Sequence, residues 1–351
     1  MKLKKFFAGV LAAAMMLTVG ATAAFAETPA GATADDSVTI TKTYKLENDN
    51  TASGDDTFTF TITGQKVENS AVKTVPQITN PTKTVTLAAS KDGATQHFTV
   101  KYGDLNITRP GVYYYTITES GSYAGVTGTN SLILKVTAGY EGNNKTLSYW
   151  SAVRETENSD KGAGFTNTYQ AGNLSVTKNV TGSLGDHESD FYFLVSLSSD
   201  KNVTSTVSYA GGRNENGTFA FTTKNGEGEK ATWTASKVLK LHDGETFTIS
   251  NLPYGVSYDV KELSDSSKVD STVSAGDELT VDGIKYTVSY DNAATGALNA
   301  ASAATIITNN AGTATIDTGV ILDNAPYIAL LAIVAIGGVA LMLNKRRRDE
   351  E

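Results

Sequence analysis

The sequence predicts an all-β protein of two tandem sandwich domains, flanked by an N-terminal export signal and a C-terminal membrane-spanning helix. The 351-residue chain contains 49 threonines, and this β-branched residue favours strands. Short alternating segments separated by Gly, Asn and Asp turns recur from Asp35 to Gly312, without a convincing helical period. Segments of the first half also recur in the second half, which indicates a repeated domain.

The internal repeat sets the domain boundaries. Residues 57–62 correspond to residues 190–195, and residues 110–115 correspond to residues 253–258. The offset is about 140 residues, a reasonable size for one elaborated sandwich. We therefore expect an N-terminal domain over residues 27–170 and a C-terminal domain over residues 171–312. Because only residues 170–173 separate the halves, we expect a stiff, end-to-end rod.

Residues 1–26 have the pattern of a secretory signal peptide. Lys2, Lys4 and Lys5 form a cationic start, and an apolar run follows from Phe6 to about Val19. Residues 24–26 read Ala-Phe-Ala, which is the small-x-small cleavage pattern, so the mature chain is expected to begin at Glu27. The alternative is a retained membrane anchor.

The C-terminal segment, residues 313–351, combines a short motif, an apolar span and a basic tail. Residues 327–343 carry no charge over 17 positions, the short limit for a membrane-spanning helix, and basic residues 345–348 place the tail in the cytoplasm. Upstream lies Thr315-Ile316-Asp317-Thr318-Gly319. The arrangement resembles the cell-wall sorting signal of Gram-positive surface proteins, which sortases cut between Thr and Gly, here Thr318 and Gly319. Thr315 and Ile316 replace the usual Leu-Pro, which leaves the sortase class open. A plain C-terminal membrane anchor is the alternative.

Composition excludes several kinds of chemistry. The chain has no cysteine, so it has no disulfide, no thiolate metal site and no cysteine nucleophile. Its three histidines, His97, His187 and His242, lie far apart in sequence, which argues against a metal site or a catalytic triad. A formal net charge of −8 argues against nucleic acid as a partner. We expect no metal and no cofactor.

Strand alternation places ionisable residues within apolar stripes in both halves. Lysine, glutamate and asparagine follow one another in the same order, with Lys-to-Asn spacings of 125 and 131 residues and Glu-to-Asn spacings of 48 and 47. Taken singly, each has an ordinary explanation, such as a lysine whose ammonium reaches water at a strand end. The six positions are Lys42, Glu119 and Asn167 in the first half, and Lys178, Glu262 and Asn309 in the second.

Three such side chains that meet inside a sandwich can react. Burial lowers the pKa of lysine and raises the pKa of glutamate, so both can be neutral near pH 7. A neutral amine is a nucleophile, and a protonated carboxyl group can polarise the asparagine carbonyl and shuttle protons as ammonia leaves. The product is a Lys–Asn isopeptide bond that joins the first strand of a domain to its last, without an external cofactor.

Several sequence segments resemble those of the streptococcal-type backbone pilins, of the pilin isopeptide-linkage family. The resemblance covers nearly the whole chain. The segments are residues 38–42, residues 110–115 with Glu119, residues 165–167, and residues 325–330 before the span. The resemblance implies an immunoglobulin-like (Cna B-type) sandwich in each domain and an autocatalytic isopeptide bond in each. It implies two reacting sets, Lys42–Asn167 with Glu119 and Lys178–Asn309 with Glu262. Asn309 is assigned by face parity, and the adjacent Asn310 is the alternative.

The same resemblance implies a covalent, cell-wall-anchored pilus built by sortase. A lysine shortly before the first-domain asparagine then attacks the sortase acyl-enzyme; Lys161 lies six residues ahead of Asn167, and an ordinary solvated lysine is the alternative. The implied partners are sortase, neighbouring pilin subunits, and peptidoglycan or a basal pilin. A non-polymerised wall-anchored adhesin for host or microbial surface ligands is the competing function. A two-carboxylate enzyme is disfavoured, because Glu119 and Glu262 belong to different repeats.

Overall fold

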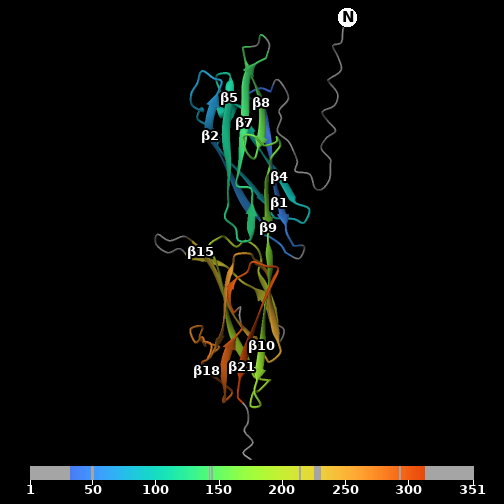
Figure 1. Cartoon of the computed structure of the whole chain (residues 1–351), viewed down its shortest axis with the longest axis vertical. Helices are drawn as coiled ribbons and strands as arrows, with labels where there is room; N and C mark the ends of the chain where they lie inside the picture. Colours follow the sequence, from blue (N-terminus) through green and yellow to red (C-terminus); the bar gives the residue numbers. More distant parts are fainter. Residues whose placement is uncertain are drawn as a thin grey trace, which may run out of the picture.

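Two all-β domains are stacked end to end along one long axis, as Figure 1 shows. The structure is a computed structural model, and it describes residues 32–48, 51–141, 143, 145–212, 215–224, 231–291 and 294–312. The expectation of an all-β, two-domain chain is confirmed. Among these residues the structure contains no helix long and apolar enough to cross a membrane. The predicted signal peptide, the sorting motif with Thr318 and Gly319, and the span at 327–343 lie outside the described residues.

The first domain consists of two facing sheets. One has the strand order β4-β1-β9-β6 and the other the order β3-β2-β5-β7-β8. A single 3-10 turn, η1 (Gly103–Leu105), follows β4. The strands are β1 (Ser37–Leu46), β2 (Asp56–Glu68), β3 (Thr82–Leu87), β4 (Ala94–Lys101), β5 (Gly111–Ser120), β6 (Val126–Gly128), β7 (Ser131–Tyr140), β8 (Leu147–Arg154) and β9 (Phe165–Tyr169).

The second domain repeats this plan with extra short strands. Its sheets have the orders β13-β12-β16-β10-β21-β19-β18 and β14-β15-β11-β17-β20. The strands are β10 (Ala171–Thr181), β11 (Phe191–Ser199), β12 (Ser208–Gly211), β13 (Glu215–Thr218), β14 (Thr222–Lys224), β15 (Thr232–Leu241), β16 (Thr246–Pro253), β17 (Ser257–Leu263), β18 (Glu278–Val281), β19 (Ile284–Tyr290), β20 (Thr295–Ala297) and β21 (Ser302–Asn310).

In each domain the first and last strands are hydrogen-bonded neighbours that run parallel. β1 pairs with β9 in the first domain, and β10 pairs with β21 in the second. On its other side the first strand has an antiparallel partner, β4 or β16. A parallel pair needs a long crossover connection, and here the rest of the domain supplies it. The two ends of each domain are therefore brought side by side.

Alternation along the strands builds the cores as predicted. The buried stripe of β1 is Val38, Ile40, Lys42 and Tyr44, and the stripe of β10 repeats it with Leu174, Val176, Lys178 and Val180. Each domain has its own cluster of buried apolar side chains. The clusters interlock at the junction, because Ala171 of β10 packs in the first-domain cluster and Ala124 of the first domain packs in the second.

The join between the domains is shorter than the sequence suggested. β9 ends at Tyr169 and β10 begins at Ala171, so Gln170 alone connects them, and residues 171–173 belong to the sheet. A closed set of backbone hydrogen bonds surrounds it: Gln170 N–H donates to Gly125 O (2.8 Å), Gly125 N–H to Tyr254 O (3.0 Å), and Tyr254 N–H to Gln170 O (3.0 Å). The junction is thus held by backbone pairing.

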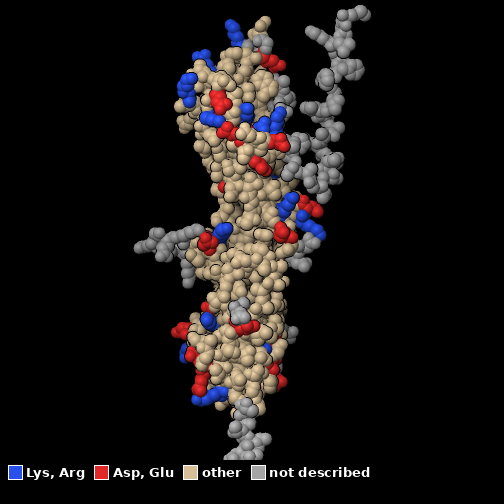
Figure 2. All heavy atoms as spheres, in the orientation of Figure 1, with Lys and Arg blue, Asp and Glu red and all other residues tan. Residues whose placement is uncertain are grey.

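Side chains also lock the junction. The Asn251 amide donates to the carbonyl oxygens of Ala52 (2.8 Å) and Thr206 (3.0 Å), and its oxygen accepts from Ala52 N–H (3.1 Å). The buried Asp56 carboxylate accepts from the hydroxyls of Tyr44 (2.6 Å) and Thr204 (2.5 Å). These contacts tie the first domain to the second and favour a stiff, end-to-end rod. On the face drawn in Figure 2, charged side chains lie toward both ends of that rod and also at the sides of its middle.

Candidate functional site

The first candidate site lies between the two sheets of the first domain. β1 contributes Lys42, β9 contributes Asn167, and β5 of the facing sheet contributes Glu119. The Lys42 Nζ atom donates to Glu119 Oε2 at 2.7 Å, and the Asn167 amide donates to Glu119 Oε1 at 2.5 Å. Glu119 therefore contacts both the amine and the amide.

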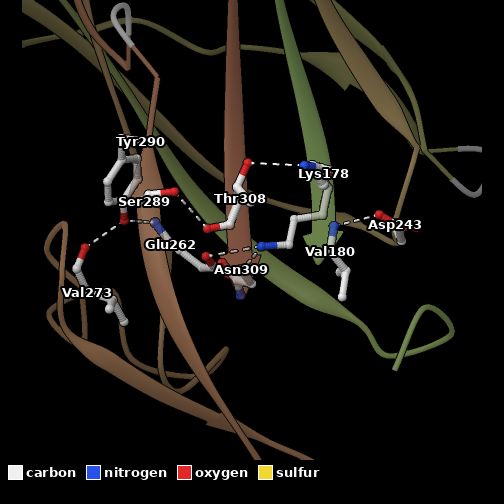
Figure 3. Close-up of polar contacts among 10 residues, drawn as sticks. Lys178, Val180, Asp243, Glu262, Val273, Ser289, Tyr290, Thr308 and Asn309 are labelled. Atoms are coloured by element: carbon white, nitrogen blue, oxygen red, sulfur yellow. Dashed lines mark hydrogen bonds and ion pairs between the residues drawn. The ribbon is translucent and has the colours of Figure 1, made fainter. Parts of the chain in front are cut away.

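The second candidate site repeats this arrangement, as Figure 3 shows. Lys178 on β10 donates to Glu262 on β17, with Nζ 3.3 Å from Oε1 and 3.4 Å from Oε2. The Asn309 amide on β21 donates to Glu262 Oε1 at 2.8 Å. The structure thus brings together both of the predicted Lys, Glu and Asn sets.

The same strand register underlies both sites. Lys42 is paired with Phe165, two residues before Asn167, and Lys178 is paired with Ile307, two residues before Asn309. In a parallel pair, an offset of two residues places the two side chains diagonally on one face of the sheet. The two domains therefore present lysine and asparagine to each other in the same way.

Both sites are sealed from water. The Lys42, Lys178 and Glu262 side chains are fully buried, and that of Glu119 is 5% exposed. Aromatic rings line the sites: Lys42 Nζ lies 3.9 Å from the Phe58 ring centroid, and Lys178 Nζ lies 4.2 Å from that of Phe191. Sequence reasoning did not assign these rings, although both lie in the repeated segments at 57–62 and 190–195.

Burial changes the protonation of these groups. Desolvation lowers the pKa of Lys42 and of Lys178 to about 8, although the paired glutamate opposes the shift. Desolvation likewise raises the pKa of Glu119 and of Glu262, and the nearby lysine only partly offsets it. The two shifts favour proton transfer from amine to carboxylate within each pair.

The asparagine carbonyl groups are the unsatisfied part of both sites. Asn167 Oδ1 and Asn309 Oδ1 are buried and have no hydrogen-bond partner. Such an oxygen is costly to leave unpaired. A half-turn of the carboxamide brings it to the glutamate oxygen, where a protonated carboxyl group could donate to it. The arrangement can therefore activate the amide for attack.

The remaining predicted residues lie elsewhere. Asn310 is exposed, and its side-chain oxygen accepts from Gly312 N–H at 2.7 Å, so only Asn309 points to Lys178 and Glu262. Lys161 is exposed in the connection between β8 and β9. The parts of the chain that the structure describes contain no group of three or more His, Asp or Glu side chains arranged to hold a metal ion.

Comparisons with known protein families match both domains separately. Residues 38–170 match the model of the Spy0128-like isopeptide containing domain. Residues 172–315 match DUF7601, a domain of unknown function.

Comparisons with individual proteins cover most of the chain. A curated protein described as "Pilin", from Streptococcus pyogenes serotype M1, is 28% identical over 319 residues, covering 88% of this chain and 90% of its own. The crystal structure of the major pilin from Streptococcus pyogenes gives a TM-score of 0.48 at 23% identity, over 79% of this chain and 99% of that one. The major pilin T3.2 of the same species gives 0.48 at 17% identity, over 80% and 99%.

Proposed function

Because this chain is a pilin homologue of the Streptococcus pyogenes type that contains a Spy0128-like isopeptide domain, we propose that it is the repeating subunit of a covalent, cell-wall-anchored pilus. It is a structural protein and not an enzyme. Each domain carries one internal Lys–Asn isopeptide bond in this proposal, and sortase links successive subunits through Thr318.

The observation that carries the proposal is the matched geometry of the two sites. Lysine and asparagine come from the parallel first and last strands at the same two-residue offset, and a buried glutamate contacts both. A lysine–glutamate ion pair with a purely structural role would not need an asparagine at the same position beside it in both domains. The recurrence in two separate domains supports a shared reaction. The parallel first and last strands also support the assignment of each domain to the immunoglobulin-like, Cna B-type sandwiches.

The reaction needs only the three side chains. The neutral lysine Nζ attacks Cγ of the asparagine, and the glutamate carboxyl polarises the carbonyl oxygen. The proton lost by the amine passes through the carboxyl group to Nδ2, which leaves as ammonia as the C–N bond breaks. One amide replaces another, so the balance is one ammonia released per bond. Much of the rate comes from holding amine and amide together in a rigid core.

The pH dependence of this reaction is expected to be bell-shaped. The reactive form is a neutral lysine beside a protonated glutamate. It holds as many protons as the ion pair, so its population does not change with pH between the pKa of the glutamate and the pKa of the lysine. At lower pH both groups are protonated and the charged amine cannot attack, whereas above about pH 8 the pair loses its last proton and no acid remains to polarise the carbonyl. To test this, chains that have never folded, and therefore carry no internal bond, are diluted from denaturant into buffers of different pH. The loss of ammonia is then followed by mass spectrometry. A rate that keeps rising to pH 10 would contradict this mechanism.

Polymerisation explains the other features of the chain. The end-to-end domains suit a subunit of a fibre, and the predicted sorting signal would hold the chain at the membrane until sortase cuts it. The acyl-enzyme formed at Thr318 would be attacked by Lys161 of the next subunit, and the last subunit would be joined to peptidoglycan or to a basal pilin. The product would be a pilus on the cell surface.

Replacing Lys161 with alanine is expected to abolish the ladder of SDS-resistant multimers in cell-wall extracts, because the acceptor amine is gone. The internal bonds should still form, since Lys161 lies outside both sites. Lys145→Ala, which removes another exposed lysine of the first domain, is the matched control and should keep the ladder. A single band at subunit size in the unmodified protein would instead favour a non-polymerised adhesin.

A further inference from the structure

The strand that carries Glu262 loses its outer neighbour before it reaches that residue. β20 pairs with β17 only over residues 257–259, and one further backbone bond joins Val260 N–H to Ala294 O at 2.8 Å. On its inner side, β17 remains paired with β11, where Phe193 is opposite Glu262. There the edge of β17 lies beside residues 271–273, where Leu263 and Thr272 form an isolated antiparallel bridge, and the backbone N–H of Glu262 takes its support from a side chain.

Tyr290, at the end of β19 in the opposite sheet, supplies that support. Its hydroxyl accepts from the backbone N–H of Glu262 at 3.0 Å and donates to Val273 O at 2.6 Å. Val273 N–H in turn donates to Glu262 O at 2.8 Å. Figure 3 shows the Tyr290 hydroxyl between Glu262 and Val273. Both backbone groups of Glu262 are satisfied by this ring of three hydrogen bonds.

The first domain holds its glutamate differently. β5 lies between β2 and β7, and its pairing with β7 extends to Thr118, one residue before Glu119. Phe60 on β2 is opposite Glu119, and the backbone N–H of Glu119 donates to Asn130 O at 2.8 Å. The backbone N–H of Glu119 is thus held by a main-chain carbonyl, where that of Glu262 is held by a side chain. The two domains therefore place the same carboxyl group by different means.

We propose that Tyr290 is a positioning residue for isopeptide bond formation in the second domain, and for that domain only. Its hydroxyl fixes the main chain of Glu262, and so holds the carboxyl group against Lys178 Nζ and the Asn309 amide. This inference rests on the proposed function. It assigns to Tyr290 a role that strand pairing fulfils in the first domain.

Two further observations fit this role. Burial raises the pKa of Tyr290 to about 12, so the hydroxyl keeps the proton that it donates to Val273 O. Tyr290 is also the residue of β19 paired with Ile307, while Val288 is paired with Asn309, so its strand lies directly beside the strand that bears the reacting amide. The hydroxyl thus joins both sheets at the level of the site.

The test compares Tyr290→Phe with Tyr286→Phe. Tyr286 lies on the same strand and is buried, but its hydroxyl accepts from Asp186 N–H at 3.0 Å and not from Glu262. Never-folded chains are diluted from denaturant into native buffer and quenched at intervals. Tryptic peptides then give the extent of the Lys42–Asn167 and the Lys178–Asn309 bond separately. The first-domain bond is an internal control for folding.

In Tyr290→Phe we expect the second-domain bond to form more slowly, by as much as about 100-fold, the cost that a displacement of about 1 Å at a reacting group can have. The first-domain rate should not change, and Tyr286→Phe should leave both rates unchanged. The acid limb of the pH profile should also move to lower pH, because a less firmly held Glu262 would be better solvated and its pKa would be raised less. The other charged groups near Tyr290 are Asp259, Asp277 and Lys261.

Equal second-domain rates in Tyr290→Phe and the unmodified chain would overturn the inference. So would equal slowing in Tyr290→Phe and Tyr286→Phe, or an unchanged pH profile, since these would show general destabilisation of the domain. If the unmodified chain forms neither bond, the proposed function itself fails, and that outcome is recognised before any variant is compared.

Discussion

Replacing Lys178 with methionine is expected to remove one of the two internal bonds and to destabilise the second domain by about 4–5 kcal/mol. That is the figure for a cross-link that closes a loop of about 100 residues, and Lys178 and Asn309 are 131 residues apart. Methionine retains most of the lysine stem, so the buried stripe of β10 stays filled. Intact mass should show one ammonia loss instead of two, and denaturant unfolding should give the stability.

Lys285→Met is the control for this variant. Lys285 is largely exposed on β19 and pairs with Glu278, an interaction worth little in water. It should keep both ammonia losses and a stability within about 0.5 kcal/mol of the unmodified chain. Two ammonia losses in Lys178→Met would show that a different amine reacts. Lys42→Met should behave in the same way for the first domain.

Replacing Glu262 with glutamine should have the larger effect, because it blocks the reaction while the buried amine remains. The shape of the side chain is kept, but neither a proton carrier nor a counter-charge is left for Lys178. Removing one partner of a buried ion pair costs about 3–5 kcal/mol, in addition to the lost cross-link. The second-domain bond should be absent, while the first-domain bond forms normally.

This variant should also show a distinct pH dependence. Without Glu262, only the smaller effect of the Asp243 charge still opposes the desolvation that lowers the pKa of Lys178. A lysine whose pKa is lower in the folded than in the unfolded state makes folding less favourable as the pH falls. Between about pH 10 and pH 8, stability should therefore decrease by about 1.4 kcal/mol per pH unit. Glu119→Gln is the matched variant of the first domain, and a flat profile in both would contradict the burial argument.

Much of the site could be predicted from the sequence, because a strand alternates its faces with period two. That rule alone placed Lys42 with Val38 and Ile40, and it selected Asn309 over Asn310. Each of the six residues has an ordinary explanation when it is taken singly. The repeat indicates that they form two equivalent sets, because the same residue types recur in the same order in both halves. The all-β, two-domain organisation followed from the same alternation and from the turn residues between segments.

Other features depend on contacts that no local pattern encodes. The parallel pairing of β1 with β9 joins residues more than 100 positions apart, and its two-residue offset is fixed by the packing of whole sheets. The linker is shorter than the sequence predicts, because residues 171–173 look like a turn yet already pair with β16 or β21. The role of Tyr290 arises because β20 ends before Glu262, which cannot be recognised before the sheet order is known.

The most direct test of the two proposed bonds is mass spectrometry, on the intact protein and on its tryptic peptides, of the mature chain without substitutions. If both proposed bonds form, the intact mass is lower than the sequence mass by two molecules of ammonia. Two branched peptides should also be found, one joining Lys42 to Asn167 and the other joining Lys178 to Asn309. An intact mass equal to the sequence mass, with linear peptides that contain unmodified Lys42, Asn167, Lys178 and Asn309, would contradict the proposal.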